Sequence, residues 1–67
     1  MFDNYYEKVR EYADWFVENE EGEKWDIDEI AFELRRCRDD GECFLSKMGD
    51  ETFGEFTHDV IDVYLNR

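Results

Sequence analysis

Apolar residues recur at helical spacing through the first part of this 67-residue chain. Between about Asp3 and Asn19 they stand at i, i+3, i+4 and i+7, which is the pattern of an amphipathic α-helix. Asp3 or Asn4 is suited to cap the N-terminus of this helix. The apolar positions are Phe2, Tyr5, Tyr6, Val9, Tyr12, Ala13, Phe16 and Val17.

A polar turn and a capping pattern mark the start of a second helix. The run from Asn19 to Lys24 contains no apolar residue, so it is predicted to be a turn. Asp26 is a suitable N-cap, and Glu29 three residues later completes a capping box. Trp25 and Ile30 occupy the two positions of a hydrophobic staple, which places the helix start near Asp26.

The second helix is predicted to run to about Arg38, with Gly41 as its stop signal. Phe32 falls away from the apolar face, and two interpretations stay open: it packs under the next short helix, or it is an exposed interface anchor. The arginines near the C-terminus suit the negative end of the helix dipole and the neighbouring acids. The apolar face consists of Ile27, Ile30, Ala31, Leu34 and Cys37, the arginines are Arg35, Arg36 and Arg38, and the acids are Glu33, Asp39 and Asp40.

The rest of the chain contains one ambiguous stretch and a third long helix. Residues 42–56 are predicted to begin with a short helix up to Met48, with a hairpin as the alternative. Residues 51–65 form the last predicted helix, with Asp50 as its N-cap, and Gly54 favours a start later than Glu51. The apolar face of this helix consists of Phe53, Phe56, Val60, Val63 and Tyr64.

A chain of 67 residues supports one small core, because it buries only about 60% of its unfolded surface. None of the helices can bury its apolar face alone, so they must pack together. The predicted fold class is all-α, a small bundle of three main helices plus a short connecting helix, in a single acidic domain over residues 1–67. No apolar run could span a membrane and no signal peptide is visible, so the cytoplasm is the expected location.

The net charge of the chain limits the kinds of partner that it can bind. Twenty acidic residues against eight basic ones give a formal net charge of −12. Such a field repels nucleic acid and anionic membranes, so no direct binding to either is expected, and it attracts basic surfaces. Solubility, or life in a salt-rich cytoplasm, would also explain the composition, so the placement of the acids decides between these explanations.

The acids of the first and last predicted helices lie in two ordered rows. On a helical wheel, each row falls within roughly 80° and faces away from the apolar side. Like charges at these spacings destabilise a helix by about 0.2–0.5 kcal/mol per pair. A small domain has little stability to spare, so the ordering favours a binding surface over simple solvation. The first acidic row is Asp3, Glu7, Glu11, Asp14 and Glu18, and the second acidic row is Glu51, Glu55, Asp59 and Asp62.

In its size, its charge and its acidic helices, the chain resembles the small inhibitors that phages and other mobile elements make against host defence, including anti-CRISPR and DNA-mimic proteins. The features that carry the resemblance are the rows from Asp3 to Glu18 and from Glu51 to Asp62; no family motif is matched. The resemblance implies a non-enzymatic inhibitor that occupies a basic nucleic-acid-binding surface, where carboxylate pairs with Arg and Lys are strong. The implied partner is a Cas effector, a restriction enzyme or a similar protein of the host cytoplasm. The partner-binding residues expected from this sequence are the two rows for such an inhibitor, and Phe32 for the alternative described next.

A different class of function competes with this one. The chain could instead be an adaptor or antitoxin-like interaction module without nucleic-acid mimicry, which would use Phe32 and neighbouring aromatics and could form a homodimer. Cys37 and Cys43 are spaced for a disulfide, although buried thiols are favoured in the cytosol. His58 is the single histidine and lacks a nucleophile partner. The sequence therefore predicts no catalytic residue, no metal site and no cofactor.

Overall fold

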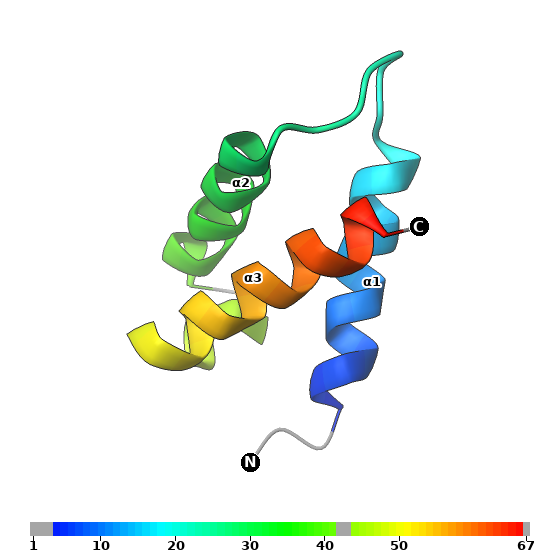
Figure 1. Cartoon of the computed structure of the whole chain (residues 1–67). Coiled ribbons are helices and arrows are strands. Elements are labelled where there is room, and N and C mark those ends of the chain that lie inside the picture. The colour runs from blue at the N-terminus through cyan, green and yellow to red at the C-terminus, as the bar shows by residue number, and fades with distance from the viewer. Residues whose placement is uncertain (1–3, 42–43, 67) are drawn as a thin grey trace.

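The computed structural model describes residues 4–41 and 44–66. Within these ranges the chain forms helices and no strand: α1 (Tyr5–Glu18), α2 (Ile27–Asp40), the short 3-10 helix η1 (Phe44–Lys47) and α3 (Asp50–Leu65). The predicted all-α bundle of three main helices and a short connecting helix is confirmed (Figure 1). Residues 44–56 contain η1 and the first part of α3 and no strand, so the hairpin alternative is wrong.

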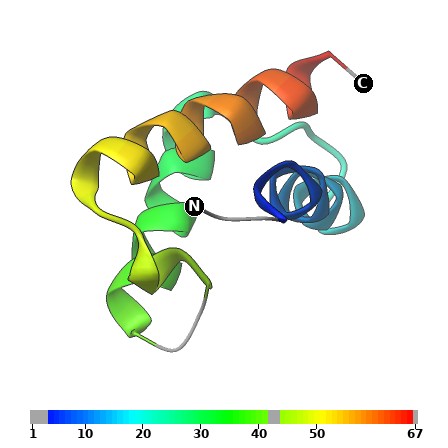
Figure 2. The same ribbon diagram turned by 90° about the horizontal axis from the view of Figure 1, so that it is seen from below.

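The third long helix, α3, joins the other two. It crosses α1 obliquely and packs against both α1 and α2, while η1 packs against α2. Figure 2 shows α1 end-on with α3 passing beside it, and η1 next to the C-terminal end of α2. Because α3 is the shared neighbour, the position of α1 relative to α2 depends on it.

All four helical segments contribute to one hydrophobic core. Phe16 from α1, Leu34 from α2 and Phe56 from α3 are among its largest buried side chains. Full burial of such a side chain contributes about 1.5–3 kcal/mol, which stabilises helices that would be marginal alone. The buried set is Val9, Ala13, Phe16, Ile30, Leu34, Leu45, Met48, Phe56, Val60 and Tyr64.

The segment between α1 and α2 is anchored to α1 and to α3 by hydrogen bonds. The Trp25 indole Nε1–H donates to the Phe16 carbonyl at 2.9 Å, and the Trp25 backbone N–H donates to the Tyr64 hydroxyl, also at 2.9 Å. The Tyr64 hydroxyl in turn donates to the Glu20 carboxylate. The Asp26 backbone N–H donates to Glu29 Oε1 at 3.2 Å, which is one half of the predicted capping box.

Some predicted helix details are wrong. Ile27 does not lie on the inner face, because it begins α2 at the edge of the bundle, beside Leu65, and is 53% exposed. The last helix begins at Asp50 with Gly49 as its N-cap, and it continues through Gly54. Helix α3 therefore tolerates the glycine, at a cost of about 1 kcal/mol relative to alanine.

Candidate functional site

The first acidic row lies on α1, on the side away from the core. Glu7, Glu11 and Glu18 are exposed and Asp14 is half-buried, whereas Asp3 lies outside the described residues. Lys8 Nζ approaches Glu11 Oε2 at 3.5 Å, and the Glu11 side chain remains 64% exposed. An ion pair this open to water neutralises little of the row.

The second acidic row lies on α3. Glu51, Glu55 and Asp62 are exposed, but Asp59 is half-buried. The Tyr5 hydroxyl donates to Asp59 Oδ2 at 2.7 Å, so this carboxylate belongs to the contact between α1 and α3. Its other oxygen lies 3.9 Å from His58 Nδ1, on a side chain that is 83% exposed.

The two rows do not form one continuous strip. They run along α1 and α3, two helices that pack together at an oblique crossing, so the rows are not parallel (Figure 1). Asp59 is the member of the second row that reaches α1, and it does so from within the fold. The structure therefore presents two separate acidic faces.

Two arginines of α2, Arg36 and Arg38, are engaged with acids outside both rows. Arg38 Nη2 lies 2.8 Å from Asp50 Oδ1, and its guanidinium stacks 4.9 Å from the centre of the Phe53 ring. Arg36 Nη1 lies 3.3 Å from Glu33 Oε1, as expected from the sequence. Arg38 therefore links the C-terminal end of α2 to α3, and neither of these two ion pairs involves a row residue.

Phe32 is 63% exposed on α2, so it does not pack under the next short helix; its role as an interface anchor stays a prediction. The choice between a Cys37–Cys43 disulfide and the favoured buried thiols is not tested, because Cys43 lies outside the described residues. Phe32 is thus accessible to a partner. It is distant from both acidic rows in the sequence, and among the described residues the structure shows no contact between its side chain and a row residue.

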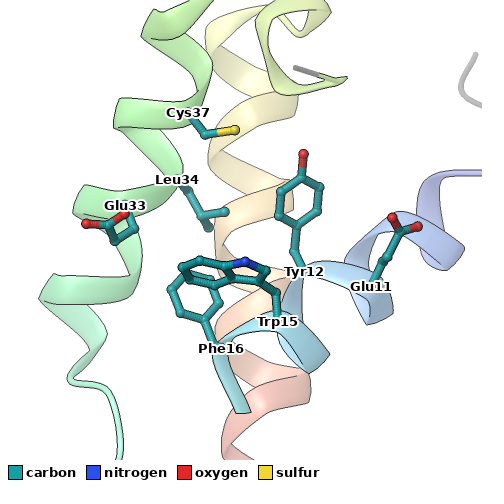
Figure 3. Close-up of a pocket in the computed structure, with 7 residues that line it drawn as sticks. All are labelled: Glu11, Tyr12, Trp15, Phe16, Glu33, Leu34 and Cys37. Carbon is teal, nitrogen blue, oxygen red and sulfur yellow. The ribbon is translucent and has the colours of Figure 1, made fainter. Parts of the chain in front are cut away.

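A groove of about 360 Å³ opens between α1 and α2. Figure 3 shows Trp15 and Phe16 reaching from α1 toward Leu34 of α2, with Glu11 and Glu33 on opposite flanks. Helix α3 backs the groove, because aromatic rings that line it also contact α3. The lining residues are Glu11, Tyr12, Trp15, Phe16, Glu33, Leu34 and Cys37.

The aromatic side chains of this groove are held in place by ring contacts. The Trp15 ring lies edge-on to Phe16 at 5.1 Å between centroids and 6.0 Å from Trp25. Tyr12 lies edge-on to Phe56 of α3 at 5.5 Å. Trp15 nevertheless stays 45% exposed, so the groove offers an accessible indole, and Glu11 and Glu33 lie on its two flanks.

Sequence reasoning identified Glu11 and missed the rest of the groove. Trp15 was the available signal, because it is a bulky aromatic at the border between the apolar face of α1 and the first acidic row. Glu33 could not be connected with it, since the two residues lie on different helices whose crossing the sequence does not specify.

Two tyrosine hydroxyls are perturbed, and both are structural. Burial raises the pKa of Tyr64, and its hydrogen bond to the Glu20 carboxylate raises it further, against the opposing effect of the Trp25 N–H. Burial likewise raises the pKa of Tyr5, with the hydrogen bond to Asp59 adding to the effect. Both groups hold helices and turns together rather than lining the groove.

Among residues 4–41 and 44–66, no cluster of three or more histidine, cysteine or acidic side chains is arranged to bind a metal ion. No helix in those ranges is both long and apolar enough to cross a membrane. Comparisons of the chain with protein-family models, with curated proteins and with solved structures gave no match. The geometry of the acidic faces and of the groove is therefore the basis for assigning a function.

Proposed function

We propose that this chain is a non-enzymatic inhibitor that uses its acidic helix faces to occupy a basic, nucleic-acid-binding surface of another protein, in the manner of DNA-mimic and anti-CRISPR proteins. The observation that carries the proposal is the exposure of both rows. Six of the nine row residues are exposed to solvent: Glu7, Glu11, Glu18, Glu51, Glu55 and Asp62.

The charge spacing sets the scale of such mimicry. Carboxylates one helical turn apart are about 5.4 Å apart along the axis, whereas duplex DNA carries one charge per about 1.7 Å. Each acidic face therefore replaces a few phosphates rather than a long stretch of duplex. A few charge-assisted pairs with Arg or Lys suffice for a small interface, and the net charge of −12 adds long-range attraction.

The competing proposal is an interaction module without nucleic-acid mimicry. It is favoured by apolar side chains on the outside of the bundle, where Phe32 is 63% and Tyr6 79% exposed. Ile27 and Leu65 also border one shallow hollow at the end of α3. A partner bound through these residues would respond to apolar truncation rather than to salt.

Capture from a host lysate at low salt, with competition by duplex DNA, tests the proposed function. The wild-type chain should retain a basic partner that both salt and DNA displace. Neutralising four exposed row residues should abolish capture, while neutralising four exposed acids outside the rows should preserve it. The row variant is Glu7→Gln, Glu18→Gln, Glu51→Gln and Glu55→Gln; the matched control is Glu21→Gln, Glu23→Gln, Asp28→Asn and Asp39→Asn.

Capture that is equally strong for both quadruple variants, and that survives high salt and excess DNA, would refute the mimicry. Loss of capture on Phe32→Ala alone would instead favour the interaction module.

A further inference from the structure

We infer that the groove between α1 and α2 receives one arginine side chain from the basic partner, stacked on Trp15 in a groove flanked by Glu11 and Glu33. The inference rests on the proposed function, because it assumes that the partner surface is cationic. It adds a specific anchoring site to an attraction that would otherwise be spread over two acidic faces.

The aromatic wall of the groove suits a planar cation. Tryptophan is the strongest cation–π partner among the aromatic side chains, and guanidinium groups also stack on flat rings. Trp15 is 45% exposed, yet its ring is fixed between Phe16 and Trp25. A ring already held in place loses little freedom when a ligand stacks on it.

Acidic residues flank the groove from both helices. Glu11 comes from α1 and Glu33 from α2, on the two flanks of the groove (Figure 3). A guanidinium offers five N–H donors in a fixed fork, so it can pair with a carboxylate on either flank while it stacks on Trp15. No apolar ligand would be expected to prefer a groove with this pair of charges at its edges.

Both carboxylates have cations from their own helix, but these pairs are loose. Lys8 Nζ lies 3.5 Å from Glu11 Oε2, and Arg36 Nη1 lies 3.3 Å from Glu33 Oε1. Strong charge-assisted hydrogen bonds are about 2.7–2.9 Å long, and both of these pairs are longer than that. An incoming arginine can therefore exchange with them at little cost.

The size and the floor of the groove fit one side chain. A cavity of about 360 Å³ lies near the lower end of the range for ligand pockets, which is too small for a folded element of a partner. Phe16 and Leu34 give it an apolar floor that can cover the methylene stem of an arginine. A lysine fills the same space but has no planar group to stack.

Titration of the intact chain with hexa-arginine and hexa-lysine peptides tests the site. Trp15→Leu and Glu33→Gln should each weaken hexa-arginine binding by about two- to fivefold, and should change hexa-lysine binding less. Glu55→Gln in the second acidic row is the matched control for charge, and it should weaken both peptides equally. If Trp15→Leu lowers the stability of the fold, the result for Glu33→Gln is used to test the site, because Glu33 lies outside the core.

Proton–nitrogen correlation spectra give a second readout. The Trp15 indole N–H resonance should shift on addition of hexa-arginine, whereas that of Trp25, whose indole N–H donates to the Phe16 carbonyl, should shift much less. Equal shifts of the two indoles, or equal losses of both peptides in the groove variants, would overturn the arginine site.

Different results would contradict the arginine site and the proposed function of the acidic faces. Unchanged hexa-arginine binding in Trp15→Leu and Glu33→Gln, together with weaker binding in the quadruple row variant defined above, would overturn the groove and leave the acidic faces in place. Absence of binding to either peptide by the wild-type chain at low salt would overturn both.

Discussion

The Tyr5 hydroxyl donates a hydrogen bond to Asp59 Oδ2 at 2.7 Å and links α1 to α3 across 54 sequence positions. The Tyr5 ring also packs edge-on against Phe56, with 5.6 Å between the ring centroids. One carboxylate of the second acidic row is therefore a structural element, and the remaining row residues are the ones available to a partner.

Tyr5→Phe should destabilise the fold by about 1–2 kcal/mol, because it removes the donor and leaves a half-buried carboxylate with one partner fewer. Urea unfolding followed by circular dichroism measures the loss. Tyr6→Phe is the matched control, since Tyr6 is 79% exposed and should change stability little. Equal losses in both variants would show that the bond to Asp59 does not stabilise the helix crossing.

Stability should fall as the solution becomes strongly alkaline. The pKa values of Tyr5 and Tyr64 are raised in the folded chain, so the unfolded chain loses these protons first. Their contribution is fully present below about pH 10, the ordinary tyrosine value, and is lost as the pH rises toward the folded-state values. Urea unfolding at a series of pH values should show this decline, with a smaller slope for Tyr5→Phe. A free energy of unfolding that stays constant through this window would contradict the assignment.

Added sodium chloride should raise the melting temperature, because salt screens the repulsion within the exposed acidic rows. Glu55→Gln should mimic part of this effect, with a gain of about 0.2–0.5 kcal/mol for each like-charged neighbour removed. Glu21→Gln in the exposed turn is the matched control and should have a smaller effect. A melting temperature that does not respond to salt would mean that the repulsion is already relieved.

The helix ranges could be predicted from the sequence because the buried residues carry the helical period. Phe16, Leu34 and Phe56 fall on predicted inner faces and are buried. Ile27 is the exception: it falls on the predicted inner face but is exposed. A residue in the first turn of a helix is buried only if another element packs over that end of the helix.

The site could be predicted only in part. Row residues on the outer side of one helix follow from spacing alone, whereas the bond of Asp59 to Tyr5 depends on where α3 crosses α1. The groove depends on tertiary packing as well. Trp15 and Glu33 line the same groove from α1 and α2, and both of these helices pack against α3.

Lys8→Met should tighten hexa-arginine binding by about two- to fivefold, because it removes the cation that competes for Glu11. Methionine keeps an unbranched apolar stem near Phe44, over whose ring the Lys8 Nζ lies at 5.7 Å. Lys24→Met changes the net charge equally from an exposed position in the turn. If both variants gain the same affinity, net charge alone controls the binding and Glu11 has no special role.

Phe32→Ala should leave the fold within about 0.5 kcal/mol of wild type, because the side chain is 63% exposed. Under the proposed function it should also leave partner capture unchanged. Analytical ultracentrifugation and capture assays measure the two effects. Loss of a partner, or conversion of a dimer into a monomer, would transfer the function to the outer side of α2.

The most direct test is the salt dependence of affinity for the captured partner, measured side by side for the wild-type chain, the quadruple row variant and its matched control. We expect affinity to fall steadily with salt for the wild type and the control, and to be weak at every salt concentration for the row variant. Affinity that is independent of salt, or equal in all three proteins, would contradict a role for the acidic faces in binding.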